Sequence, residues 1–191
     1  AAFLELSLKK LVNCLINPQL DFKVKFSVIR AISGLAQAVG FAALSPVIKQ
    51  LLALLQSITE NITNLSIPLD DEDSAEFFEN MVVSVYLCYS RMLAGGTEVI
   101  ASFLNVPIRL SLLVYQKIAS DKGYLQPDKI LSAVLSFYNV IFDTPLLTSS
   151  PQLRAQVFTP DVIQFLVNCV SSIEDEEERH VGTILLRKLQ H

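Results

Sequence analysis

The sequence predicts an all-α protein of nine or ten helices. Apolar residues return at steps of three and four along most of the chain, and the strict alternation that marks a half-buried strand is almost absent. Proline, glycine and asparagine divide the chain into segments of helix length, most of them joined by short connections. With 51% hydrophobic residues among 191, the chain is able to bury a substantial core.

Three helices are expected in the first 60 residues. The first spans Phe3–Ile16 and stops at Asn17-Pro18, because a residue before proline is pushed out of the α region. The second spans Asp21–Val39, capped by its aspartate and followed by a glycine. The third opens at Ser45-Pro46, with serine as cap and proline as first helical residue, and continues to Glu60.

An acidic loop, Asn61–Asp73, is the longest connection that the sequence predicts. The next helix is expected over Ala75–Leu93, with Asp73 or Ser74 as its cap. Glu76 and Glu79 then lie near its start, where the positive end of the helix dipole favours a carboxylate.

Six helices are expected in the remainder of the chain, several of them opening at a proline. Proline suits the first helical position because the N–H that it lacks would have no partner there. The predicted ranges are 97–104, 107–120, 127–143, 151–157, 160–172 and 175–189.

Two short segments near the ends of the chain echo each other. Leu11-Val12-Asn13-Cys14-Leu15 returns as Leu166-Val167-Asn168-Cys169-Val170, and each copy is followed by a polar turn and an amphipathic helix. The copies are separated by close to four times the ~40-residue period of armadillo and HEAT repeats. This pattern resembles the armadillo type, in which a Leu-Val-x-x-Leu helix precedes a turn and a second helix. Residues 61–125 depart from it.

The resemblance implies a right-handed α-solenoid of about four armadillo/HEAT-like units, forming one helical-repeat domain over residues 1–191. We expect the chain to be a segment of a larger protein, since it opens on Ala1-Ala2-Phe3-Leu4 rather than methionine. Its mean hydropathy of +0.45 fits a piece of a solenoid, because end repeats expose a face that a neighbour would cover.

The net charge of −4 is unevenly distributed. Residues 1–60 carry six basic and three acidic side chains, whereas residues 61–100 carry one basic and seven acidic. A general nucleic-acid binder needs a continuous basic stripe, so protein partners are favoured and nucleic acid is not expected as a direct ligand. No apolar run approaches the ~20 residues of a membrane-spanning helix. Three widely spaced cysteines favour an intracellular location, in nucleus or cytoplasm.

No pattern in the sequence predicts catalysis, a cofactor or a metal. His180 lies at a charged helix start without a positioned partner, and His191 is the last residue. Cys14 and Cys169 hold matching places in the two echoing segments, as small buried hydrophobes do. The acidic runs lack the glycine and glutamate that an EF-hand loop needs at its sixth and twelfth positions. We therefore expect a protein that is not an enzyme.

Charged side chains and two tyrosines are the candidate partner-binding residues. The basic ones belong to the first helical pair, the acidic ones to the long loop and to the start of the last helix. Tyrosine keeps a polar tip that suits the wall of a groove. The set is Lys9, Lys10, Lys23, Lys25, Arg30, Asp70, Asp71, Glu72, Asp73, Tyr89, Tyr138, Glu176 and Glu177. The alternatives are solvated faces for the charges and core positions for the aromatic rings.

We expect a non-catalytic protein-interaction scaffold within a larger multiprotein assembly, binding a partner helix or peptide along a helical face. The segment Asn17–Phe22, which leads into a helix with alanine and glycine, is similar to helical scaffolds of meiotic recombination and DNA-repair assemblies. The alternative is a transport or GTPase-regulating helical-repeat adaptor. The absence of tryptophan counts against an armadillo cargo receptor.

Overall fold

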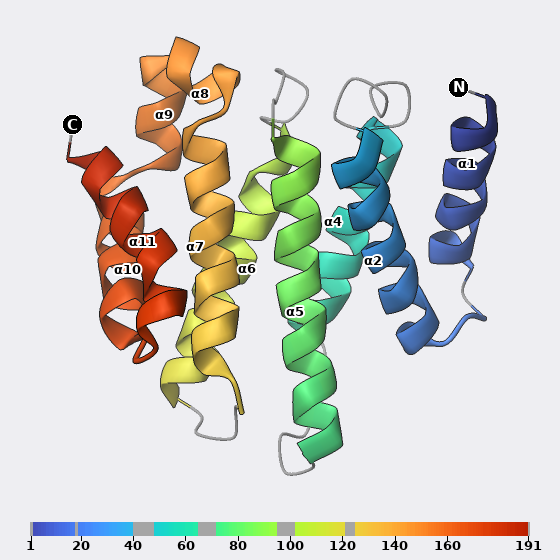
Figure 1. The fold of residues 1–191 in the computed structure, drawn as a ribbon, viewed down its shortest axis with the longest axis horizontal. Coiled ribbons are helices and arrows are strands. Elements are labelled where there is room, and N and C mark those ends of the chain that lie inside the picture. The colour runs from blue at the N-terminus through green and yellow to red at the C-terminus, as the bar shows by residue number, and fades with distance from the viewer. Residues whose placement is uncertain are drawn as a thin grey trace.

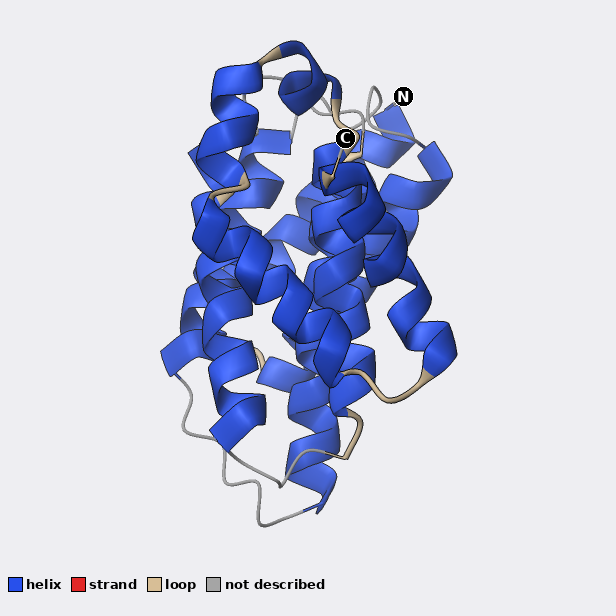
Figure 2. Ribbon diagram, turned by 90° about the vertical axis from the view of Figure 1, so that its left-hand side faces the viewer, coloured by secondary structure: helices blue, strands red, loops and turns tan. Residues whose placement is uncertain are grey.

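A computed structural model describes residues 2–17, 19–39, 48–64, 72–94, 102–120 and 125–190, and this part of the chain is all-α with ten helices. The described connections lie mainly at the two ends of the helix bundle (Figure 2). The predicted fold class, all-α with nine or ten helices, is confirmed for these residues.

Four helices lie side by side in one row (Figure 1). Each of them packs against the next, and the second and third share the most extensive contact. The row consists of α2 (Phe22–Val39), α5 (Glu72–Leu93), α7 (Pro127–Phe142) and α11 (Glu176–Leu189).

Each helix of this row also packs against the long helix that precedes it in the chain. These preceding helices are α1 (Ala2–Ile16), α4 (Ile48–Asn64), α6 (Asn105–Ser120) and α10 (Pro160–Ser172). Among them, α4 contacts both α1 and α6, and the rings of Tyr115 on α6 and Phe165 on α10 meet edge to face at 5.5 Å. Eight of the described helices are therefore arranged as four consecutive pairs, and two short helices lie between the third and the fourth pair.

The core is continuous from pair to pair, and aromatic rings meet where α5 packs against α7. Phe137 of α7 lies edge to face with Tyr86 at 5.6 Å and with Tyr89 at 6.1 Å. All three side chains are fully buried. Each such side chain removes a large apolar area from water, a gain of about 1.5–3 kcal/mol for a residue the size of phenylalanine.

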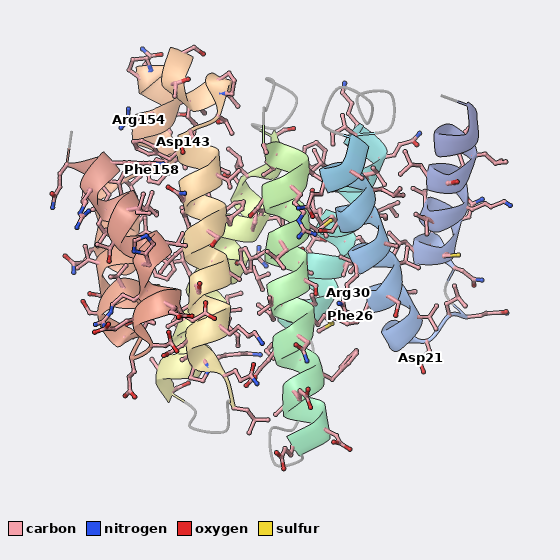
Figure 3. All side chains as sticks on the ribbon, in the orientation of Figure 1. Asp21, Phe26, Arg30, Asp143, Arg154 and Phe158 are labelled. Carbon is pink, nitrogen blue, oxygen red and sulfur yellow. The ribbon has the colours of Figure 1, made fainter. Side chains whose placement is uncertain are left out.

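The C-terminal end of α7 is tied to its neighbours by polar contacts. Lys188 of α11 donates hydrogen bonds to Asn139 Oδ1 at 2.9 Å and to Asp143 Oδ2 at 2.5 Å. The guanidinium of Arg154 stacks 4.0 Å from the centre of the Phe142 ring. Asp143 and Arg154 lie at this end of the molecule in Figure 3. The ion pair is partly exposed, so we expect it to contribute at most about 1 kcal/mol.

Most predicted helices are confirmed to within a few residues, and three expectations need correction. The acidic loop is shorter than Asn61–Asp73, because α4 continues to Asn64 and α5 already begins at Glu72. Of the short helix expected over 97–104, residues 97–101 lie outside the described part, and 102–103 form a single 3₁₀ turn.

The third correction is an additional short helix, α8 (Pro145–Ser149), which precedes α9 (Pro151–Val157). The sequence pattern predicts no helix between residues 143 and 151. In the structure Thr144 is the extended N-cap residue of α8, and Pro145 is its first helical residue. The same proline thus both ends one helix and begins the next.

Within the described residues, no helix is both long enough and apolar enough to cross a membrane.

Candidate functional site

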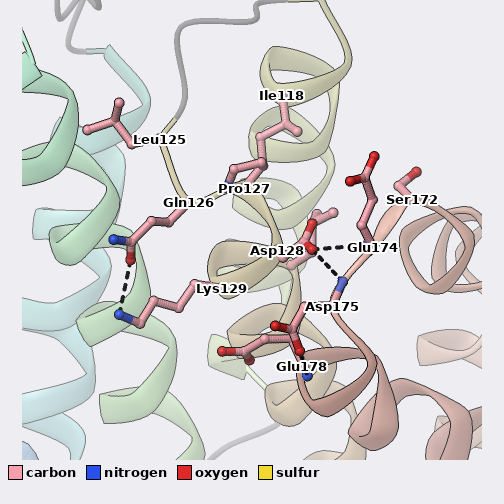
Figure 4. A pocket seen from close by; sticks show the side chains of 11 residues that line it. Ile118, Leu125, Gln126, Pro127, Asp128, Lys129, Ser172, Glu174, Asp175 and Glu178 are labelled. Atoms are coloured by element: carbon pink, nitrogen blue, oxygen red, sulfur yellow. Dashed lines mark hydrogen bonds between the residues drawn. The ribbon is translucent and has the colours of Figure 1, made fainter.

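A hollow of about 540 Å³ lies where the start of α7 meets the turn between α10 and α11 (Figure 4). It is lined by Ile118, Leu125, Gln126, Pro127, Asp128, Lys129, Leu131, Ser172, Glu174, Asp175 and Glu178. We call it the acidic hollow, because four of these side chains are carboxylates and one is an ammonium group.

Two of the four carboxylates hold the wall of the acidic hollow in place. Asp128 Oδ2 accepts hydrogen bonds from the backbone N–H groups of Glu174 at 2.9 Å and Asp175 at 2.8 Å. Asp175 is the N-cap of α11, and its Oδ1 accepts from the N–H groups of Glu177 at 2.8 Å and Glu178 at 3.1 Å. These charge-assisted bonds fix the turn against α7.

The other two carboxylates, those of Glu174 and Glu178, do not hold the wall in this way. Glu174 is exposed and Glu178 is half-buried. Within the described part of the chain, their side-chain oxygens make no hydrogen bond or ion pair. Lys129 supplies the one ammonium group of the lining, and it donates to Gln126 Oε1 at 3.0 Å rather than to a carboxylate. The acidic hollow therefore presents unneutralised negative charge.

The remaining lining is apolar and comes from α6 and the start of α7: Ile118, Leu125, Pro127 and Leu131. A long cationic side chain buries its aliphatic stem on such a surface while its charged end stays polar. Carboxylates at the rim then bind the ammonium or guanidinium group through charge-assisted hydrogen bonds. The chemistry of the acidic hollow thus fits a lysine or arginine side chain.

Two of the acidic residues predicted from the sequence are neighbours of the acidic hollow without lining it. Glu176 and Glu177 are exposed in the first turn of α11 but do not line it. Asp128, which sequence reasoning missed, joins the lining from α7. No local pattern identifies this role, because the N–H groups that Asp128 binds lie 46 and 47 residues further along the chain.

The acidic residues predicted before the fourth helix include Glu72 and Asp73, which do not line the acidic hollow. Glu72 and Asp73 are exposed in the first turn of α5, a favourable place beside the helix dipole. Asp70 and Asp71 lie outside the described residues.

The predicted basic residues are found on α1 and α2. Lys9 and Lys10 are exposed on α1, Lys25 is half-buried on α2, and Arg30 is exposed on α2. The side chain of Lys23 is outside the described part of the structure. Arg30 lies 6.0 Å from the centre of the Phe26 ring, which is within the range of a cation–π contact.

The expectation that Tyr89 and Tyr138 line a groove is wrong. Both side chains are 0% exposed, and each hydroxyl is paired inside the core. Tyr89 shares a hydrogen bond of 3.1 Å with Thr59 of α4, and Tyr138 shares one of 3.0 Å with Ser111 of α6. A buried partner for the phenol removes the reason for the ring to remain at the surface.

Burial also determines the protonation state of two thiols, those of Cys88 and Cys169. It raises the pKa of Cys88 to about 12, an effect that the Arg91 charge only reduces, and it raises the pKa of Cys169 to about 12. Both thiols therefore stay protonated at neutral pH, whereas a thiol nucleophile reacts as the thiolate. His180 is exposed on α11. No group of three or more His, Cys, Asp or Glu among the described residues is arranged to hold a metal ion.

Comparison of the chain with protein-family models, with curated proteins and with solved structures found no match. The fold and the site together define an all-α protein of paired helices, with the acidic hollow at one end of the contact between α7 and α11.

Proposed function

We propose that the chain is a non-catalytic protein-interaction scaffold of four armadillo/HEAT-like helical pairs, which captures a basic segment of a partner protein. The observation that carries the proposal is the acidic hollow. Its wall is fixed by Asp128 and Asp175, while Glu174 and Glu178 are left available to a cation.

Recurrent contacts support the repeat part of this proposal. Glu79 of α5 accepts backbone N–H groups 46 and 47 residues further along the chain, and Asp128 of α7 does the same at 46 and 47 residues. The hydroxyl pairs recur as well, Thr59 with Tyr89 and Ser111 with Tyr138. Each pair joins a row helix to the helix that precedes it. Such equivalent contacts in successive pairs are what a helical repeat produces.

Charge supports a protein partner. The chain carries a net charge of −4, and the acidic hollow adds a local negative potential that steers a basic segment towards it. A nucleic acid would be repelled from the same site. A partner helix or an extended peptide with one projecting lysine or arginine would satisfy both the apolar floor and the acidic rim.

A direct test uses the full chain and a fluorescent peptide library with lysine or arginine at the central position. Fluorescence anisotropy compares the wild type with the double variant Glu174→Gln/Glu178→Gln. We expect the affinity to fall at least tenfold, because a lost charge-assisted hydrogen bond costs about 1.5–3 kcal/mol and tenfold corresponds to about 1.4 kcal/mol.

The matched control is Glu176→Gln/Glu177→Gln, which removes the same charge from the same helix start without altering the lining. Its affinity should change less than about threefold, because Glu176 and Glu177 are exposed and lie outside the lining. Equal losses in both double variants would show that only overall charge matters, and the acidic hollow would not be the binding site.

A further inference from the structure

A second polar pocket, of about 210 Å³, lies between α2 and α5. It is lined by Arg30, Ser33, Ser84, Leu87 and Arg91. In contrast to the acidic hollow, this lining has two guanidinium groups, two hydroxyl groups and no carboxylate. We call it the arginine pocket.

Arg91 is held in a defined position within the arginine pocket. Its Nη1 donates a hydrogen bond to Ser33 Oγ at 2.7 Å, and Ser33 is only 3% exposed. Because a guanidinium carries five N–H donors in a rigid plane, this bond orients the group and leaves other donors for a ligand. Ser33 accepts this bond, so its own hydroxyl hydrogen remains able to donate.

Arg30 completes the cationic side of the pocket from α2. Its guanidinium carbon lies 6.0 Å from the centre of the Phe26 ring, and that ring packs edge to face on Phe77 of α5 at 5.7 Å. Figure 3 shows Arg30 and Phe26 together on α2, on the side where α5 lies. Arg30 is exposed, and the aromatic contact favours a side chain that lies along Phe26, beside α5.

The two positive charges of the arginine pocket have no counter-charge in the described part of the chain. Neither Arg30 nor Arg91 has a carboxylate within ion-pair distance there, although the described residues of α5 include Glu72, Asp73 and Glu76. Two like charges brought to one small pocket repel each other, so an anion that contacts both is favoured.

We propose that the arginine pocket binds a phosphate monoester on a segment of a partner protein, a phosphoserine or phosphothreonine. A phosphate monoester carries a charge of about −1.5 to −2 and three acceptor oxygens. Two guanidinium groups and two hydroxyls match that charge and that number of acceptors, whereas a single carboxylate would neutralise only one arginine. Leu87, 37% exposed, adds an apolar contact for the carbon that bears the phosphate.

A phosphoprotein fits better than a nucleic acid. Binding of a phosphodiester backbone depends on several cations spaced along a groove, and its affinity comes from releasing many counterions. The arginine pocket is a single small recess on a chain with net charge −4.

The test is calorimetric titration of the full chain with inorganic phosphate and with a degenerate phosphoserine peptide library, next to the same library without phosphate. We expect saturable phosphate binding, and at least tenfold tighter binding of the phosphorylated library. Arg91→Lys keeps the charge but loses the planar fork, and Arg30→Gln removes an exposed charge. Each should weaken phosphate binding about fivefold or more, with the thermal unfolding midpoint of Arg30→Gln unchanged.

Arg109→Gln is the matched control, since Arg109 is an exposed arginine of α6 that does not line the pocket. It should bind phosphate as the wild type does. The proposal is overturned if phosphate does not saturate, if Arg109→Gln loses as much affinity as Arg30→Gln, or if a single-stranded oligonucleotide binds through the same arginines more tightly than the phosphoserine library. Basic peptides bind elsewhere, so their affinity should be unchanged in the arginine variants, and either proposal can fail without the other.

Discussion

The carboxylate of Glu79 on α5 accepts the backbone N–H of Leu125 at 2.5 Å, across 46 residues of chain. Its second oxygen accepts the N–H of Gln126 at 3.1 Å, directly before α7 begins. Glu79 is 4% exposed, so a carboxylate that would be costly to bury alone is satisfied by two donors. Leu125 and Gln126 also line the acidic hollow, so this contact positions one side of the candidate site.

Replacing Glu79 with glutamine should lower the free energy of unfolding by about 1–3 kcal/mol, because the buried amide is uncharged and has an oxygen for only one of the two N–H groups. Chemical denaturation with two optical probes measures the change. Glu76→Gln, an exposed position on the same helix, should stay within about 0.5 kcal/mol of the wild type. If the two variants were equally stable, the Glu79 contact would contribute nothing to the fold.

Gly182 of α11 should not tolerate a larger residue. A Cβ there would lie 2.5 Å from Val170 Cγ2 and 2.7 Å from Leu135 Cδ1. We expect Gly182→Ala to destabilise by about 1–3 kcal/mol through overpacking. Gly34→Ala is the matched comparison, since a Cβ at Gly34 meets nothing within 4 Å, and it should stabilise α2 by about 0.5–1 kcal/mol. A stabilising Gly182→Ala would mean that α11 packs less closely than described.

The buried hydroxyl pair of Tyr138 and Ser111 should show coupling. Tyr138→Phe alone should cost about 1 kcal/mol, since it leaves the Ser111 hydroxyl with its bond to Ile108 O at 2.6 Å but without the phenol. Ser111→Ala alone should cost a similar amount, and the double variant less than the sum. Additive losses in this double-mutant cycle would rule out the pairing.

Alkaline pH should destabilise the protein. Burial raises the pKa of Cys88 and Cys169 from 9.0 to about 12, and it raises the pKa values of Tyr86, Tyr89 and Tyr138 above their usual 10.0. The folded state thus holds protons that the unfolded chain releases. The stability from these groups is complete below pH 9 and is lost as the pH rises towards 12 and beyond.

Urea midpoints measured in steps from pH 8 to pH 12 check this expectation. The midpoint should be level up to about pH 9 and fall above it. In the variant Cys88→Ala/Cys169→Ala the midpoint should begin to fall nearer pH 10, because only the buried tyrosines then remain to lose protons on unfolding. A midpoint that is flat across this range would contradict the burial of these groups.

Local sequence signals are sufficient to predict most of the helices. Pro127 and Pro160 open α7 and α10 where predicted, because proline at the first helical position acts through its own backbone. The helix predicted over 175–189 is found as α11, and Asp175 is its N-cap rather than its first helical residue. This contact is also local, because its partners, Glu177 and Glu178, are two and three residues away.

Contacts between residues that are far apart in the sequence cannot be predicted from such local signals. Glu79 was assigned to the helix dipole of its own helix, yet its partners lie 46 and 47 residues away. Arg91 was not singled out at all, and its bond to Ser33 spans 58 residues. The acidic hollow and the arginine pocket both arise from such pairings, which is why the sequence identified charged runs but not the cavities that they form.

The capture of a basic partner segment is tested most directly by crosslinking within a pull-down on the full chain. An amine-reactive crosslinker reports through Lys129, which lines the acidic hollow and is unchanged in every variant. We predict that one partner lysine is joined to Lys129 in the wild type and in Glu176→Gln/Glu177→Gln, and that this crosslink is lost in Glu174→Gln/Glu178→Gln. A Lys129 crosslink that persists in the last variant, or partner crosslinks that never include Lys129, would contradict the proposed site.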